Sequence, residues 1–157
     1  MTVALILARL GFDQTTLMAA LLHDTVEDTS ATLDDLELEF GAEVCDLVGA
    51  CSEQKLDAEG WKRSWHDRKR SHLELLEHAG RQVRAIVLAD KLHNLISMQS
   101  DLASGVDIWS LFHADRAVWL AHTRHSITIL GQGSDADLAL RQLVSDCLTA
   151  LAKLEVA

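Results

Sequence analysis

The chain has 157 residues, enough for one domain with a hydrophobic core and too few for two comfortable ones. Its 14 basic and 24 acidic residues give a net charge of −10, which repels a nucleic-acid backbone and argues against binding of a polymer. No apolar run approaches the roughly 18 residues of a membrane span, and the start lacks a signal-peptide pattern. We therefore expect a soluble cytoplasmic protein that binds no membrane.

The composition favours helices with short connections, because proline is absent, glycine occurs eight times, and Ala, Leu, Glu and Asp are abundant. No linker rich in Gly, Ser or Pro and no internal repeat is present, which supports a single domain over residues 1–157. Cys45, Cys51 and Cys147 form no C-x-x-C pair, so reduced, structural thiols are expected.

Apolar residues at helical spacing predict a first helix over residues 3–10, ended by Gly11 in the position of a C-terminal cap. Only Met1 and Thr2 precede this helix and no N-cap is present, which suggests that an upstream segment is missing. Asp13 is placed to cap the helix that follows.

Residues 23–28 place one imidazole and three carboxylates directly after an apolar run. On one continuous helix all four groups project into a sector about 140° wide, and burying them is costly unless something uses them. Imidazole beside carboxylate suits a divalent ion such as Mn²⁺, Fe²⁺ or Zn²⁺, and a second acidic pair could orient or deprotonate a water. The alternative is a solvated helix end with scattered acids. The four residues are His23, Asp24, Glu27 and Asp28.

The next helix is predicted to begin with a capping box of Thr32 and Asp35 and to end at Gly41, and another helix follows it. Residues 52–60 are polar and predict a loop. Residues 61–78 hold the only basic concentration, on a predicted helix. A solvated face is the ordinary interpretation of such a run, but in an acidic chain it is also where an anionic substrate would bind. Arg68 and Lys69 are the predicted contacts.

Residues 83–94 predict a buried helix in which Asp90 follows an apolar run. Asp90 is either a metal ligand or a carboxylate paired with Lys91, and Asn94 lies one turn further on the same face. His93, His122 and His125 are interpreted as structural. Ser134 and Asp137 have capping-box spacing before a last helix that is predicted to serve packing. Two subunits could also meet at this helix, so a homo-oligomer stays open.

Two of these stretches, ALLHDTVEDT at residues 20–29 and LADKLHNL at residues 88–95, resemble the HD-domain metal-dependent phosphohydrolases. The likeness is strongest to small stand-alone hydrolases of guanosine 3′,5′-bis(diphosphate), the stringent-response alarmone. TLDDL at residues 32–36 and FGAEV at residues 40–44 resemble the helix pair that follows the His-Asp motif in that family. The resemblance spans roughly residues 3–120 and implies an all-α, single-domain helical bundle of HD type.

The resemblance also implies roles for individual residues. It makes His23, Asp24 and Asp90 ligands of a metal ion, typically Mn²⁺, although another divalent ion is possible. Glu27 and Asp28 match the catalytic pair that positions and activates the attacking water. Lys91 and Asn94 match positions near the bound nucleotide. The implied reaction is removal of the 3′-pyrophosphate of ppGpp or pppGpp by water.

One feature departs from the family pattern. The first ligand of the family is a histidine that would lie two residues ahead of Met1. Three interpretations follow: a shortened form of an active enzyme, a site completed by His93 or a partner subunit, or a domain that no longer turns over. The competing functions are therefore hydrolysis of another nucleotide, or nucleotide binding by a catalytically degenerate regulatory domain. A helical scaffold with incidental acids is the least expected.

Overall fold

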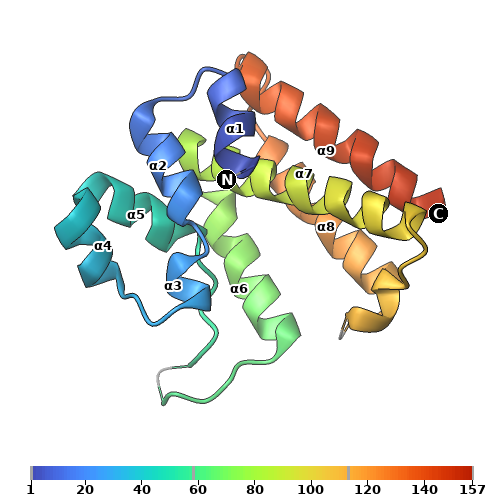
Figure 1. The fold of residues 1–157 in the computed structure, drawn as a ribbon, viewed down its shortest axis with the longest axis horizontal. Coiled ribbons are helices and arrows are strands. Elements are labelled where there is room, and N and C mark those ends of the chain that lie inside the picture. Colours follow the sequence, from blue (N-terminus) through green and yellow to red (C-terminus); the bar gives the residue numbers. More distant parts are fainter. Residues whose placement is uncertain (1, 58, 113, 157) are drawn as a thin grey trace. The chain divides into compact units, whose positions relative to one another are not determined.

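The computed structural model describes residues 2–57, 59–112 and 114–156, which form helices and their connections (Figure 1). These described residues contain no β-strand, and one isolated antiparallel bridge joins Leu56 and Lys62. The predicted all-α fold class is therefore confirmed. The helices are α1 (Thr2–Arg9), α2 (Gln14–Leu22), α3 (Thr25–Asp28), α4 (Leu33–Phe40), α5 (Ala42–Cys51), α6 (Trp65–Glu77), α7 (Arg81–Ala103), the 3₁₀ helix η1 (Ile108–Leu111), α8 (Arg116–Gly131) and α9 (Leu138–Val156).

The chain divides into two compact units, one up to Val87 and one from Leu88 onward. The division falls within α7, so the residues of this helix belong partly to each unit. The single domain over residues 1–157 remains a prediction. Among the described residues, no helix is both long enough and apolar enough to cross a membrane.

In the first unit, α1 packs against α2, α2 against α5, and α4 against α5 (Figure 1). Leu7, Ala19 and Val48, on α1, α2 and α5, are fully buried apolar residues of this unit. The predicted end of α1 is confirmed, since Gly11 adopts a φ of 77° that side chains with a Cβ disfavour. These local signals set the short connections that lead to the acidic stretch.

The capping box at the start of α4 is also confirmed. The Asp35 amide donates to Oγ1 of Thr32 at 3.2 Å, and the Thr32 amide donates to Oδ2 of Asp35 at 2.9 Å. Both bonds satisfy donors that the first turn of a helix leaves unpaired. The capping box therefore fixes where the chain re-enters a helix after residues 29–31.

In the second unit, α8 packs against α9. A hydrogen bond also joins α7 to α9, because Nε2 of Gln99 donates to the carbonyl of Ala150 at 2.7 Å. Cys147 is fully buried, and burial raises the pKa of its thiol to about 12. No disulfide joins the three cysteines, as predicted. The largest fully buried side chains of this unit are Leu88, Leu95, Ile127, Leu130, Leu143, Leu151 and Leu154.

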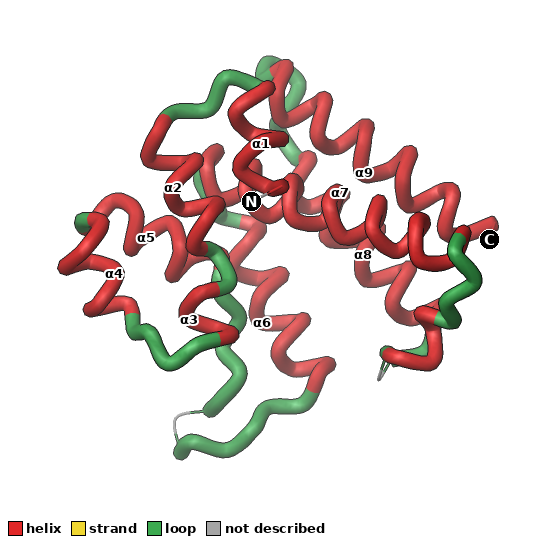
Figure 2. The backbone as a smooth tube through the Cα atoms, in the orientation of Figure 1, coloured by secondary structure: helices red, strands yellow, loops and turns green. Residues whose placement is uncertain are grey.

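The prediction of one continuous helix through residues 23–28 is wrong. Helix α2 ends at Leu22, His23 and Asp24 form a turn, and α3 begins at Thr25 (Figure 2). The ring of His23 donates from Nδ1 to the carbonyl of Ala20 at 3.0 Å. In an unbroken helix that carbonyl would accept from the backbone amide of Asp24, so the side chain competes with helix continuation.

Two helix starts also differ from the prediction. Helix α6 begins at Trp65 rather than near residue 61, because Ser64 caps it and accepts a hydrogen bond from the Asp67 amide at 3.1 Å. Asp137, not Ser134, caps α9, since Oδ1 of Asp137 accepts from the amide of Leu140 at 3.1 Å. The hydroxyl of Ser134 instead donates to the carbonyl of Gly131. In both cases a capping side chain nearer the helix determines where the helix begins.

Candidate active site

The turn between α2 and α3 brings an imidazole and a carboxylate together. Nε2 of His23 lies 3.1 Å from Oδ2 of Asp24. The carbonyl of Ala20 can only accept a hydrogen bond, so Nδ1 of His23 carries a proton and Nε2 is the nitrogen that faces the carboxylate. When the imidazole is neutral and carries its proton on Nδ1, Nε2 of His23 and Oδ2 of Asp24 are both hydrogen-bond acceptors. A proton or a cation between them is then needed to hold the two atoms this close.

The electrostatics of the turn agree with that requirement. The hydrogen bond from His23 lowers the pKa of Asp24 below its ordinary value, against the opposing effect of partial burial. An imidazole nitrogen and a carboxylate oxygen, oriented by a second bond from the ring to a carbonyl, form the kind of donor set that divalent metals use. His23 and Asp24 therefore fit the metal role predicted for them.

The third predicted ligand, Asp90, belongs to α7 within the second unit. Among the described residues, no group of three or more His, Cys, Asp or Glu side chains forms a metal cluster. The described geometry therefore brings together His23 and Asp24 from the predicted set of three, and the role of Asp90 stays a prediction.

The predicted catalytic pair lies on α3, directly after the turn. Oε1 of Glu27 accepts from the backbone amide of Glu53 at 2.8 Å, and Oε2 of Glu27 lies 3.2 Å from Nζ of Lys55. The same ammonium lies 3.4 Å from Oδ1 of Asp28. Partial burial would lower the pKa of Lys55, but its bonds to Glu27 and Asp28 outweigh that effect and raise it. Lys55 is therefore a charged partner shared by both carboxylates.

Glu53 carries the second cluster of charges in this region. Its carboxylate is only 10% exposed and pairs with Lys69, with Arg68 at 3.3 Å and with His72 at 3.5 Å. Burial by itself would raise the pKa of Glu53, but the hydrogen bonds from His72 and Lys69 lower it to about 2. The carboxylate is therefore ionised at any ordinary pH.

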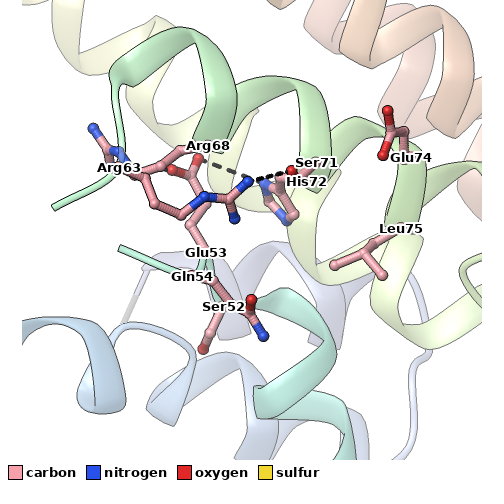
Figure 3. Close-up of a pocket in the computed structure, with 9 residues that line it drawn as sticks. All are labelled: Ser52, Glu53, Gln54, Arg63, Arg68, Ser71, His72, Glu74 and Leu75. Atoms are coloured by element: carbon pink, nitrogen blue, oxygen red, sulfur yellow. Dashed lines mark hydrogen bonds and ion pairs between the residues drawn. The ribbon is translucent and has the colours of Figure 1, made fainter. Parts of the chain in front are cut away.

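A pocket of about 320 Å³ lies between the connection after α5 and helix α6 (Figure 3). In Figure 3, Arg68, Ser71 and His72 of α6 face Glu53 of the connection. Nη2 of Arg63 donates to Oγ of Ser71 at 2.6 Å, and both residues line the pocket. The residues that line the pocket are Ser52, Glu53, Gln54, Arg63, Arg68, Ser71, His72, Glu74 and Leu75.

The structure changes how the predicted substrate contacts on α6 are interpreted. Arg68 and Lys69 both pair with the buried carboxylate of Glu53, so part of their charge is already balanced.

Sequence reasoning missed Glu53 and Lys55, which it assigned only to a polar loop. They lie 26 and 28 residues from Glu27, and no local pattern signals a contact at that separation. The one available hint was a charged segment placed shortly before a basic helix.

The second predicted motif lies on α7 in the second unit. Nδ2 of Asn94 donates to Oδ1 of Asp90 at 3.0 Å, as their spacing of four residues predicted. Asp90 and Lys91 are half-buried and Asn94 is exposed. These positions confirm the shared helix face, while the roles of the three residues stay predictions.

Comparison with known proteins identifies the family of this chain. The family model for the HD domain matches residues 1–119. The chain is 35% identical over 135 residues, 85% of its length, to guanosine-3′,5′-bis(diphosphate) 3′-pyrophosphohydrolase MESH1 of Mus musculus. The alignments span 69% of the mouse protein and 65% of the protein of the same name from Drosophila melanogaster.

Two solved structures share the fold. The crystal structure of lmo0812 from Listeria monocytogenes EGD-e matches with a TM-score of 0.84 and 29% identity, over 98% of this chain and 90% of that one. A metazoan ortholog of SpoT that hydrolyses ppGpp matches with a TM-score of 0.68 and 32% identity, over 92% of this chain and 76% of that one. The fold of this chain is thus shared with solved structures along nearly all of its length.

Proposed function

This chain belongs to the HD-domain family, and on that premise we propose that it hydrolyses the 3′-pyrophosphate of the guanosine alarmones ppGpp and pppGpp. One observation carries the proposal. The turn that holds His23 close to Asp24 is followed directly by α3, on which the carboxylates of Glu27 and Asp28 share the ammonium of Lys55. The names of the relatives supply the substrate, since the mouse protein is a guanosine-3′,5′-bis(diphosphate) 3′-pyrophosphohydrolase.

We propose that His23, Asp24 and Asp90 hold the divalent ion on which HD-domain hydrolases depend, and that this ion is Mn²⁺. When bound, such an ion polarises a phosphoryl oxygen and lowers the pKa of water. The bond from Nδ1 of His23 to the Ala20 carbonyl supports this assignment, because it keeps Nε2 oriented as a ligand.

In the proposed reaction Glu27 and Asp28 orient the attacking water and accept its proton. The water oxygen forms a bond to the phosphorus attached to the 3′ oxygen, and the bond between that phosphorus and the 3′ oxygen breaks. The 3′ oxygen leaves as a hydroxyl after taking up a proton, so ppGpp gives guanosine 5′-diphosphate and pyrophosphate. Glu27 suits this role because it is 20% exposed and both its oxygens are held.

We assign Lys91 and Asn94 to nucleotide contacts, and we keep Arg68 and Lys69 as contacts to phosphate. The charge of Arg68 and Lys69 is partly balanced by Glu53, so each should contribute less to substrate binding than an unpaired cation would. A small anionic nucleotide, rather than a polymer, is the partner that a net charge of −10 favours. We further propose a cytoplasmic location, one HD-type domain over residues 1–157 and a homo-oligomer that uses α9.

The test offers ppGpp, pppGpp and ordinary nucleoside di- and triphosphates to the protein with Mn²⁺ and measures release of pyrophosphate and phosphate. Conversion of ppGpp to guanosine 5′-diphosphate and pyrophosphate supports the proposal. Turnover of ordinary nucleotides with ppGpp untouched would indicate an HD-domain hydrolase of another nucleotide. Tight binding of ppGpp without turnover would instead indicate a regulatory domain.

A further inference from the structure

We propose that Glu53 and Lys55 are positioning residues for the carboxylates of Glu27 and Asp28. The inference rests on the proposed function, in which this pair orients the attacking water and accepts its proton. It assigns a role to the segment 53–55, which joins α5 to the basic helix α6 and contains none of the site residues predicted from the sequence. We call the segment 53–55 the clamp.

The clamp holds Glu27 at more than one point. The backbone amide of Glu53 donates to Oε1 at 2.8 Å, and Nζ of Lys55 lies 3.2 Å from Oε2. The same ammonium donates to the backbone carbonyl of Glu27 at 2.9 Å. A carboxylate bonded through one oxygen can still rotate, whereas one bonded through both oxygens has its remaining lone pairs fixed in direction. This arrangement is what a group that must meet a water in one orientation requires.

Lys55 also links the two carboxylates to each other. Its ammonium contacts Oδ1 of Asp28 at 3.4 Å as well as the side chain and carbonyl of Glu27. Two anionic groups on adjacent residues repel each other, and a shared cation offsets that repulsion while both remain ionised. Lys55 is 43% exposed, so solvent weakens this pairing, and its main effect is on orientation rather than on stability.

The clamp is fixed before and after the residues that contact Glu27. On the α5 side, the hydroxyl of Ser52 donates to the Val48 carbonyl at 2.9 Å. On the other side, the amide of Arg63 donates to the carbonyl of Lys55 at 3.0 Å, next to the bridge between Leu56 and Lys62. These bonds limit the movement of the backbone that presents the Glu53 amide.

The side chain of Glu53 anchors the middle of the clamp to α6. Its carboxylate, 10% exposed, is bound by Lys69, Arg68 and His72. One residue therefore faces two ways: its side chain is held by the basic helix while its amide holds the catalytic carboxylate. The position of the Glu27 carboxylate therefore depends on the position of α6. The same arrangement accounts for a buried carboxylate among basic residues at the pocket.

The experiment measures kcat and KM for ppGpp hydrolysis with saturating Mn²⁺ in Lys55→Met, Lys55→Arg and Glu53→Gln. For Lys55→Met we expect kcat to fall about 10- to 100-fold with KM within about twofold, because loss of orientation acts on the chemical step. Lys55→Arg keeps a cation that can reach both carboxylates and should restore most of the lost kcat. Glu53→Gln keeps the backbone amide, so a smaller loss of about tenfold is expected.

Two matched variants control for loss of charge alone. Lys153→Met removes one cation from the exposed last turn of α9, and Glu77→Gln removes one anion from the exposed end of α6. Both should keep kcat and KM within about twofold, as exposed substitutions away from a site usually do. A Lys55→Met protein with a lowered melting temperature but wild-type kcat would show a structural salt bridge only and would overturn the inference.

A second readout does not depend on turnover. Amide hydrogen exchange at Glu53 should become at least about tenfold faster in Glu27→Ala, because the acceptor of that amide is removed. The amide of Cys45, which donates to the Gly41 carbonyl, is the internal reference. If the wild-type protein hydrolyses no alarmone, the proposed function fails. Amide exchange at Glu53 still tests whether the clamp holds the Glu27 carboxylate. Unchanged exchange at Glu53 in Glu27→Ala would overturn it, and faster exchange would support it.

Discussion

The two motifs that identify the family are organised in different ways. The motif on α7 is local: Asn94 donates to Asp90 one turn earlier on the same helix, and the spacing of the two residues suffices to predict the contact. The motif at the α2–α3 turn is not local, because Glu27 is held by Glu53 and Lys55, 26 and 28 residues further along the chain. A helix thus places one motif, and tertiary contacts place the other.

The two motifs should therefore differ in how strongly substitutions elsewhere in the chain displace their side chains. A residue held by helix periodicity tolerates changes elsewhere, because the backbone alone sets its position. A carboxylate held by a distant loop depends on everything that fixes the loop, including the ion pairs of Glu53 with α6. Four experiments test this difference, from the largest expected effect to the smallest.

The largest effect is expected from the double change Glu27→Gln and Asp28→Asn. The variant keeps the size of both side chains but removes the groups proposed to accept the proton of water. We expect kcat to fall by about 10² to 10⁴-fold, the usual contribution of general acid–base groups. The measurement is pyrophosphate release from ppGpp with Mn²⁺, and Glu77→Gln is the matched control. Turnover at the wild-type rate would remove both residues from the mechanism.

His23→Ala tests the turn itself. The change removes the imidazole that lies 3.1 Å from Asp24, together with the bond to the Ala20 carbonyl. We expect the wild-type protein, purified with Mn²⁺ and desalted, to hold about one ion per chain, and the variant to bind Mn²⁺ at least about 100-fold more weakly. Elemental analysis and Mn²⁺ titration measure this. Equal metal content in both proteins would exclude His23 as a ligand.

Glu53→Gln tests the pH dependence of the clamp. The folded-state pKa of Glu53 is about 2, below its ordinary 4.5, so its ion pairs stabilise the fold above pH 4.5 and are lost as the pH falls through 2. A difference of this size corresponds to up to about 3 kcal/mol. Urea unfolding of the wild type should therefore lose up to this much more stability than that of the variant between about pH 4.5 and 2. Parallel pH profiles for the two proteins would contradict the burial and pairing of Glu53.

Asn94→Ala is expected to have the smallest effect on stability. The bond from Asn94 to Asp90 is exposed and spans one helical turn, so its loss should cost no more than about 0.5 kcal/mol. KM for ppGpp should rise if Asn94 contacts the nucleotide as proposed. Urea unfolding and steady-state kinetics on the same preparation separate the two effects. A large loss of stability with unchanged KM would give Asn94 a structural role.

Much of the fold follows from local signals in the sequence. Gly11 follows the end of α1 because glycine, which has no Cβ, readily adopts the φ of 77° that the chain needs there. Helix α4 begins after a capping box formed by Thr32 and Asp35. Both were predictable, because each involves residues within one or two helical turns. The start of α9 was less so, since Ser134 and Asp137 both have capping side chains and only the structure shows that Asp137 caps the helix.

The amino-acid sequence by itself determined the all-α class, the two motifs and the chemical types of the candidate site residues. These features depend on residue types and on spacings between residues that are close together in the chain. Only the tertiary structure decided that the helix breaks at His23 and Asp24 and that Glu53 and Lys55 hold Glu27. It also decided that Leu138, which looks like a packing residue, is 74% exposed. The physical reason is that burial and long-range hydrogen bonds depend on which segments meet after folding, and this loop gives no local signal of its partner.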